Sequence, residues 1–156
     1  NSILSDALDL DFSQGSIVNS LFQNIGNDAI DVSGTQMTMK NIAVNNASDK
    51  AISAGENSHI EANNLKIKNS KISICSKDKS EVIISDIELE NNEIGFAAFQ
   101  KKSEFGPGSI VAQKVKIKNI LTPYLIEEES YCNINNITKE SNIDYVKDIL
   151  YPKKIK

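Results

Sequence analysis

The sequence predicts an all-β solenoid of parallel strands, about six coils long, with a short helix at its carboxyl end. Three observations predict this fold class. Short phrases return after 22 residues, asparagines recur in register, and apolar residues alternate with polar ones between them. We expect coils over residues 1–141, and a cap helix with a basic tail over residues 142–156.

The repeat is clearest near the start of the chain. Residues 6–11, Asp-Ala-Leu-Asp-Leu-Asp, return 22 positions later as residues 28–33, Asp-Ala-Ile-Asp-Val-Ser. The alternating segment 17–24 returns after the same interval as residues 39–46. A period of this length is typical of a repeat protein in which each repeat forms one turn of a solenoid.

One asparagine column extends through five of the expected coils. Its members are Asn24, Asn46, Asn69, Asn91 and Asn119, spaced by 22, 23, 22 and 28 residues. The long interval contains residues 101–108, which have the composition of an inserted loop. Apolar residues precede the asparagines by two and seven positions, and the column four positions before them is apolar except for Ser20. We therefore predict a buried ladder, in which each amide donates to one neighbour and accepts from the other.

Taken in order, the coils follow this period, with turns rich in Gly, Ser and Asn. They cover residues 6–24, 25–46, 49–69, 71–91, 94–119 and 124–141. In the fifth coil Phe96 and Phe99 stand beside the insertion, which leaves two alternatives: the insertion covers them, or they form an exposed ligand platform. Apolar residues after 142 fall at helical spacing, which predicts a helix capped by Ser141 or Asn142, ended by Pro152 and laid across the last coil.

Composition and charge exclude several classes. A net charge of −4 gives no basic footprint for nucleic acid. No apolar run approaches the roughly 20 residues of a membrane span, and we recognise no signal peptide. The chain opens almost directly in a strand, without a segment to cover its first coil. We expect a carboxy-terminal fragment that associates end to end through this uncapped coil.

The candidate site is a set of aspartates on the first two coils. If Leu8 and Leu10 point inward, Asp9 and Asp31 share one outward column, Asp6 and Asp28 share another, and Asp11 lies above Ser33. Like charges on neighbouring strands destabilise a sheet, so the stacked carboxylates need an explanation. Three remain open: a solvent-screened face, a Ca²⁺ site at Asp9 and Asp31, or a sugar-cleaving site with paired carboxylates. Besides Ca²⁺ we predict no cofactor.

The repeat pattern resembles the right-handed parallel β-helix of pectate lyases, polygalacturonases and many bacterial surface proteins. Residues 5–9 are similar to the Asn-Thr-Asp-Gly-Ile-Asp stretch of polygalacturonases, and residues 26–30 to their Gly-Asp-Asp-Cys-Ile. The resemblance implies that Asp6 and Asp28 occupy two of three catalytic acid positions. It also implies an extracellular or cell-surface location.

The chain departs from the polygalacturonase pattern at other positions. Asn27 stands at the third acid position and cannot act as a general acid. Lys50 replaces the histidine of Gly-His-Gly-Ile-Ser-Ile-Gly, and residues 71–73 keep one basic residue of Arg-Ile-Lys. We therefore predict a non-catalytic segment of a larger bacterial protein, structural or carbohydrate-binding, with Asp9, Asp11 and Asp31 as candidate ligand-binding residues. The alternative is a polysaccharide-acting hydrolase, lyase or epimerase that uses Asp6, Asp28 and Asp31 with Lys50.

Overall fold

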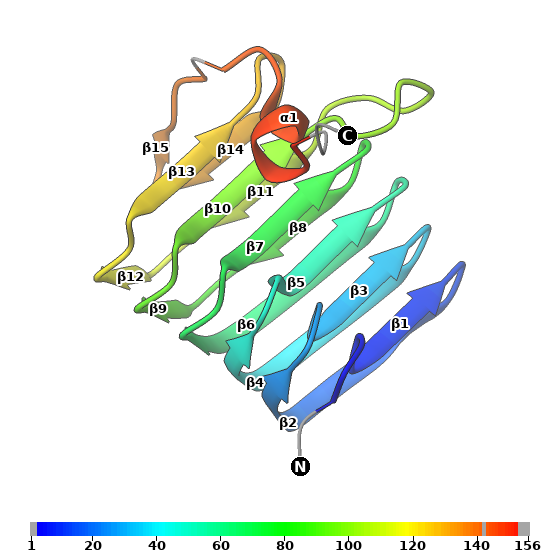
Figure 1. The fold of residues 1–156 in the computed structure, drawn as a ribbon, viewed down its shortest axis with the longest axis vertical. Coiled ribbons are helices and arrows are strands. Elements are labelled where there is room, and N and C mark those ends of the chain that lie inside the picture. The colour runs from blue at the N-terminus through cyan, green and yellow to red at the C-terminus, as the bar shows by residue number, and fades with distance from the viewer. Residues whose placement is uncertain (1–2, 142, 153–156) are drawn as a thin grey trace.

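The computed structural model describes residues 3–141 and 143–152 as a parallel β-solenoid of six coils (Figure 1). Its first sheet takes one strand from each coil, in the order β1, β3, β5, β7, β10 and β13. These strands span Leu8–Asp11, Ile30–Ser33, Lys50–Gly55, Ile72–Lys77, Ile94–Phe99 and Thr122–Ile126. Each pairs in parallel with the strand one coil away, so the fold class predicted by the repeat is confirmed.

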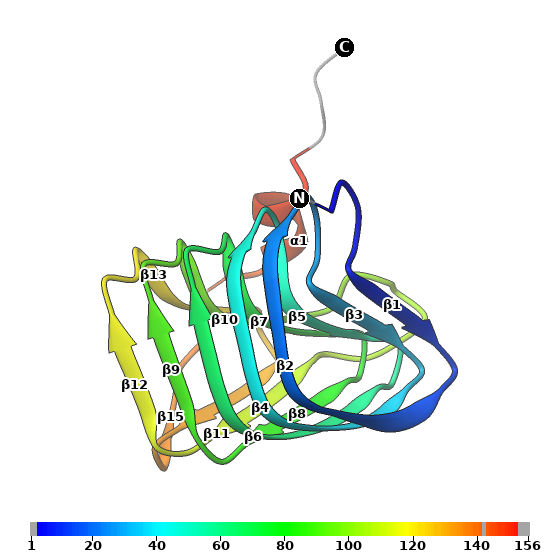
Figure 2. The ribbon, with the colours of Figure 1, turned by 90° about the horizontal axis from the view of Figure 1, so that it is seen from below.

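A second sheet forms the other sides of the solenoid, as the end view shows (Figure 2). Its strands are β2 Gln14–Ile25, β4 Gln36–Ala47, β6 His59–Lys68, β8 Glu81–Ile84, β9 Ile87–Glu90, β11 Ser109–Ala112, β12 Val115–Lys118, β14 Tyr131–Ile134 and β15 Ile137–Thr138. The long strands change direction at Asn19, Asn41 and Asn64, which have left-handed φ values of 51°, 57° and 57°. Asparagine tolerates this conformation better than most residues, so it suits a one-residue corner.

The inward apolar columns pack as the sequence predicts. Ile17 pairs with Met39, Phe22 pairs with Val44, and Val44 pairs with Ile67. In the second coil Met39 and Val44 are only 3% and 1% exposed. The core is therefore a set of aliphatic rows that extends along the solenoid axis.

The asparagine column is in register, but its predicted burial is wrong. All five members are exposed, and each has a positive φ, between 54° and 67°. Asn46 Nδ2 donates to Asn24 Oδ1 at 3.0 Å, and Asn119 Nδ2 donates to Asn91 Oδ1 at 2.8 Å. Asn69 departs from the ladder and donates to Asn45 at 2.7 Å. A corner residue with positive φ directs its side chain to the outside, where the amides still bond from coil to coil.

One buried polar ladder consists of hydroxyl groups. Thr35, Ser58 and Ser80 are at most 2% exposed and follow the corner after the first sheet. Ser13 N donates to Thr35 Oγ1 at 3.1 Å, Thr35 N to Ser58 Oγ at 3.0 Å, and Ser58 N to Ser80 Oγ at 3.1 Å. These bonds satisfy backbone donors that would otherwise be buried without a partner.

The carboxyl end covers the outer face of the first sheet. The helix α1, Val146–Leu150, is shorter than predicted, because Ser141 bonds Ile126 O at 2.9 Å and Ile143 forms a bridge with Glu127. Figure 1 shows α1 in front of this sheet, where Val146 and Leu150 pack in one buried cluster. The predicted cap at Asn142 and the basic tail at 153–156 lie outside the described residues.

The two phenylalanines of the fifth coil follow neither sequence alternative. Both are 0% exposed: Phe96 belongs to the interior, whereas Phe99 belongs to the cluster under α1. The ring of Phe99 lies 6.4 Å from that of Tyr151. The carboxy-terminal segment therefore covers Phe99, whereas the sequence suggested that the inserted loop would cover it.

Candidate functional site

The predicted acidic columns exist on the outer face of the first sheet. Asp9 pairs in register with Asp31, and Asp11 with Ser33. Asp9 and Asp11 are exposed, whereas Asp31 is half-buried. Partial desolvation and the negative charges of Asp31, Asp11 and Asp6 raise the pKa of Asp9 above its usual value. The charges therefore repel one another, as the sequence predicts for like groups on neighbouring strands.

Asp6 and Asp28 are hydrogen-bond acceptors for the backbone of the following coil. Asp6 Oδ1 accepts from the backbone N–H of Asp28 at 2.9 Å and from Asn27 Nδ2 at 2.7 Å. Asp28 Oδ1 accepts from the backbone N–H of Lys50 at 2.9 Å. The two carboxylates therefore link coils one, two and three.

Lys50 lies beside Asp28 and is only 4% exposed. Its Nζ is 3.4 Å from Asp28 Oδ1 and 2.5 Å from Asp49 Oδ2. Burial disfavours the ammonium, but Asp28, Tyr151 and Asp49 outweigh it, so the pKa of Lys50 lies above its usual value. Burial raises the pKa of Asp28, and Lys50 partly offsets this. Lys50 is therefore a protonated, paired cation at neutral pH.

A second buried lysine, Lys77, completes the cluster and was missed by the sequence analysis. Its Nζ donates to Ser53 Oγ at 2.6 Å and lies 3.5 Å from Asp31 Oδ1. Burial lowers its pKa, while Cys75 and Asp31 raise it, with a net rise. Lys77 stands two coils beyond Asp31, so the 22-residue repeat alone does not indicate this pair.

Tyr151 covers the cluster from the carboxy-terminal segment. Its ring centroid is 5.5 Å from Lys50 Nζ and 4.7 Å from Lys101 Nζ, within cation–π range. Burial raises the pKa of its phenol. The structure thus brings together Asp28, Asp31 and Lys50, with the ring of Tyr151 over this group of charges.

This arrangement restricts the chemistry available to the cluster. A lysine acts as a general base only when its amine is neutral, and both lysines are held in the charged form. Asp28 accepts a backbone hydrogen bond and faces an ammonium, so it is not a free acid. The charges are therefore mutually paired, which is typical of a structural ion network.

The calcium prediction at Asp9 and Asp31 stays a prediction. In residues 3–141 and 143–152 no group of three or more Asp, Glu, His or Cys side chains is arranged to hold a metal ion. Ca²⁺ takes about six to eight oxygen ligands, whereas Asp31 has the ammonium of Lys77 beside it.

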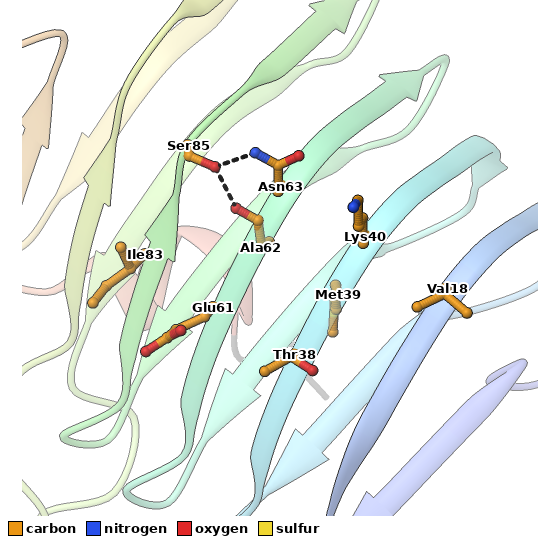
Figure 3. Close-up of a pocket in the computed structure, with 9 residues that line it drawn as sticks. All are labelled: Val18, Thr38, Met39, Lys40, Glu61, Ala62, Asn63, Ile83 and Ser85. Atoms are coloured by element: carbon orange, nitrogen blue, oxygen red, sulfur yellow. Dashed lines mark hydrogen bonds between the residues drawn. The ribbon is translucent and has the colours of Figure 1, made fainter.

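A different surface offers a hollow, on the outer face of the second sheet (Figure 3). It has a volume of about 460 Å³ and crosses β2, β4, β6 and β8; its lining residues are Val18, Thr38, Met39, Lys40, Glu61, Ala62, Asn63, Ile83 and Ser85. Asn63 Nδ2 donates to Ser85 Oγ at 2.5 Å. A neighbouring hollow shares Thr38 and Glu61, so the two form one groove, defined here as the second-sheet groove.

The groove was not a sequence prediction, because it depends on which outward side chains are short. His59 lies at its edge, with Nδ1 3.0 Å from Glu81 Oε2 and Nε2 3.2 Å from Glu61 Oε1. The lining thus presents hydroxyl, amide, carboxylate and ammonium groups over a partly apolar floor.

Comparisons with known proteins give this chain no family. No family model, no curated protein and no solved structure matches it. The part of the chain described by the structure contains no helix long and apolar enough to span a membrane. The molecule belongs to the class of parallel β-solenoids, and its likeness to polygalacturonases stays a prediction from short sequence phrases.

Proposed function

We propose that this chain is a non-catalytic, structural β-solenoid segment of a larger protein. One observation carries the proposal: the best catalytic candidates are used to join coils. Asp6 and Asp28 each accept a backbone N–H from the following coil, and Lys50 is paired with two aspartates. The bacterial origin and the secreted or cell-surface location, expected from the resemblance, are parts of the same proposal.

The rival function is a polysaccharide-acting hydrolase, lyase or epimerase. It requires a carboxyl or amine free to exchange a proton with the sugar. Asp31 makes no inter-coil backbone bond through its carboxylate, but it is half-buried, its Oδ1 is shielded from solvent, and Lys77 lies beside it. The paired state of these residues favours the structural function.

The test is a turnover assay on a panel of neutral and acidic polysaccharides. We expect no new reducing ends and no unsaturated products from the wild-type chain. Asp31→Asn serves as the matched variant, because it leaves the inter-coil bonds of Asp6 and Asp28 in place. Turnover that the wild type shows and Asp31→Asn lacks would overturn the structural function in favour of catalysis.

A second candidate function is carbohydrate binding in the second-sheet groove. The hydroxyl, amide and carboxylate groups of its lining support it, since such groups fix the orientation of a bound sugar over an apolar floor. Titration calorimetry with the same panel tests it, with Thr38→Lys to fill the groove and Lys66→Glu as an exposed control on β6 outside it. Binding lost only in Thr38→Lys would support this function, and equal heats for all three proteins would exclude the groove.

A further inference from the structure

Lys50 occupies a position at which the next two coils carry isoleucine. It pairs in register with Ile72, which in turn pairs with Ile94. The side chain of Lys50 is only 5% exposed. Burying an ion pair is often no more favourable than burying apolar side chains of similar volume, because both charges lose their hydration. The buried ammonium of Lys50 therefore needs an explanation beyond packing.

Two carboxylates lie against this ammonium group. Lys50 Nζ is 3.4 Å from Asp28 Oδ1 and 2.5 Å from Asp49 Oδ2. The side chain of Asp28 is 5% exposed, whereas that of Asp49 is 23% exposed. The ring of Tyr151 covers Nζ, with its centroid 5.5 Å away. An amine, a carboxyl group and a second carboxylate thus meet where bulk water has little access.

We propose that Lys50 and Asp28 form an intramolecular isopeptide bond, an amide between Lys50 Nζ and Asp28 Cγ, once the chain has folded. The bond joins the second coil covalently to the third. The inference rests on the proposed structural function and deepens it, because a contact between coils becomes a permanent link. A chain without the bond keeps that function, so the two proposals fail separately.

The reaction releases one water molecule and needs no other reactant. The lone pair of Lys50 Nζ attacks Asp28 Cγ, a C–N bond forms, and the bond from Cγ to Oδ2 breaks. Two of the three ammonium protons pass through Asp49 Oδ2 to the leaving oxygen, which departs as water, and the third stays on the amide nitrogen. Asp49 ends as the carboxylate that it was at the start.

The folded structure prepares the two groups for this step. The charged pair is the resting state, and proton transfer to Asp49 supplies the neutral amine. Burial is the largest influence on both partners: it raises the pKa of Asp28, and it opposes the neighbouring charges that hold the pKa of Lys50 high. The backbone N–H of Lys50, 2.9 Å from Asp28 Oδ1, is placed to stabilise the negative charge that develops on this oxygen. The fold also holds the reactants together, which replaces a bimolecular encounter.

Intact mass spectrometry of the unfolded full chain tests the bond. We expect the wild type to be lighter than its sequence mass by one water. Lys50→Arg keeps the positive charge but cannot form this amide, and Asp28→Ala lacks the carboxyl group, so both should have their full mass. Asp31→Asn is the matched control, because Asp31 belongs to the same cluster but lies beside Lys77. It should still lose one water.

Tryptic digestion locates the bond. Lys40 separates Asp28 from Lys50 in the sequence, and trypsin does not cleave after a lysine whose Nζ is in an amide. The wild type should therefore give a branched fragment in which residues 1–40 are joined to residues 41–66. A wild type of full mass would overturn the proposal. So would a water loss that persists in Asp28→Ala or that maps to a linear fragment, as an aspartyl succinimide gives.

Asp49→Asn tests the proton transfer separately. It keeps both reacting groups and removes the carboxylate that carries the protons. Followed over time at one temperature, the linked fraction should grow at least about tenfold more slowly than in the wild type. Equal rates would overturn the assignment of this role to Asp49.

Discussion

At the scale of single residues, side-chain oxygens that accept backbone N–H groups from a neighbouring coil join the coils. Asp28 is a buried carboxylate of this kind, at 4% exposure. Asp28→Ala removes the acceptor of Lys50 N and one partner of Lys50 Nζ, which should lower the free energy of unfolding by about 1–3 kcal/mol. Urea denaturation measures the loss.

Two variants calibrate this prediction. Asp28→Asn keeps an acceptor for the backbone N–H of Lys50 and should lose less stability than Asp28→Ala. Asp9→Asn removes an exposed charge from a repelling column and should leave stability unchanged or raise it. Equal losses for Asp28→Ala and Asp9→Asn would mean that the bond to Lys50 N contributes nothing.

Corner asparagines give the second prediction at this scale. Asn41 has φ 57° and belongs to an exposed ladder with Asn19 and Asn64. Asn41→Ala should lower the free energy of unfolding by about 1–2 kcal/mol. Alanine has a Cβ atom, which is strained in the left-handed region, and lacks the polar side chain with which asparagine can bond nearby groups. Asn41→Gly should cost less, since glycine adopts positive φ freely. Thermal unfolding distinguishes the two, with exposed Gln36→Ala as the control.

The asparagine columns show what a repeated residue pattern predicts and what it does not. Their register was predictable, because identical side chains recur at one interval. Their exposure was not, because a count of positions does not distinguish an inward residue from a corner with positive φ. A signal was present: Ile17 and Ser20 both head core columns and are three positions apart, which breaks the strand period of two and requires a bend between them.

At the scale of elements, α1 protects the outer face of the first sheet. Cys75 lies beneath it, and burial raises the pKa of this thiol to about 11. Val146→Asp places a charge in that contact and should release the helix, so that Cys75 reacts with a thiol reagent. Cys132 is the internal control, because it lies in the solenoid core at 0% exposure. Modification of both thiols together would indicate global unfolding instead.

An exposed ion-pair network joins the third to the fifth coil. Glu90 lies 2.5 Å from Lys68 Nζ and 2.7 Å from Lys118 Nζ, and their hydrogen bonds and charges lower its pKa to about 2. Its folded pKa is below the ordinary value of 4.5, so its stabilisation is present above that pH and is lost as the pH falls toward 2. Glu90→Gln should flatten the decline of melting temperature in this window.

High salt should reduce the same contribution, because the pairs are exposed. Glu104→Gln is the matched control, since Glu104 is exposed on the inserted loop and forms no salt bridge among the described residues. If the melting temperatures of the wild type and of Glu90→Gln fall equally as the pH is lowered, the network does not stabilise the fold.

At the scale of the whole molecule, the sequence was sufficient for the fold and only partly for the site. Each coil repeats its neighbour, so one period predicts all parallel pairings. The period also brought Asp28, Asp31 and Lys50 to one face. It did not indicate Lys77, because this side chain contacts Asp31 two coils away. It did not indicate Tyr151 either, because this residue belongs to the carboxy-terminal segment outside the repeat.

A solenoid of this kind should also distribute its stability unevenly along its axis. Each coil contacts only its neighbours, and within residues 3–141 and 143–152 the third coil has a neighbour on both sides, whereas the first has one. Ile52 is 1% exposed and pairs with both Ile30 and Ile74, whereas Ile17 is half-buried and pairs with Met39. Ile52→Ala should cost about 2–5 kcal/mol, the usual range for a buried large-to-small change.

Ile17→Ala removes the same atoms and should cost clearly less, because water already reaches its site. Equilibrium denaturation measures both variants. If the two losses are equal, the site of Ile17 is as well packed as that of Ile52, and stability does not vary along the axis. A large difference would place the weak point of this chain in its first coil, where a side chain of the interior row is only half-buried.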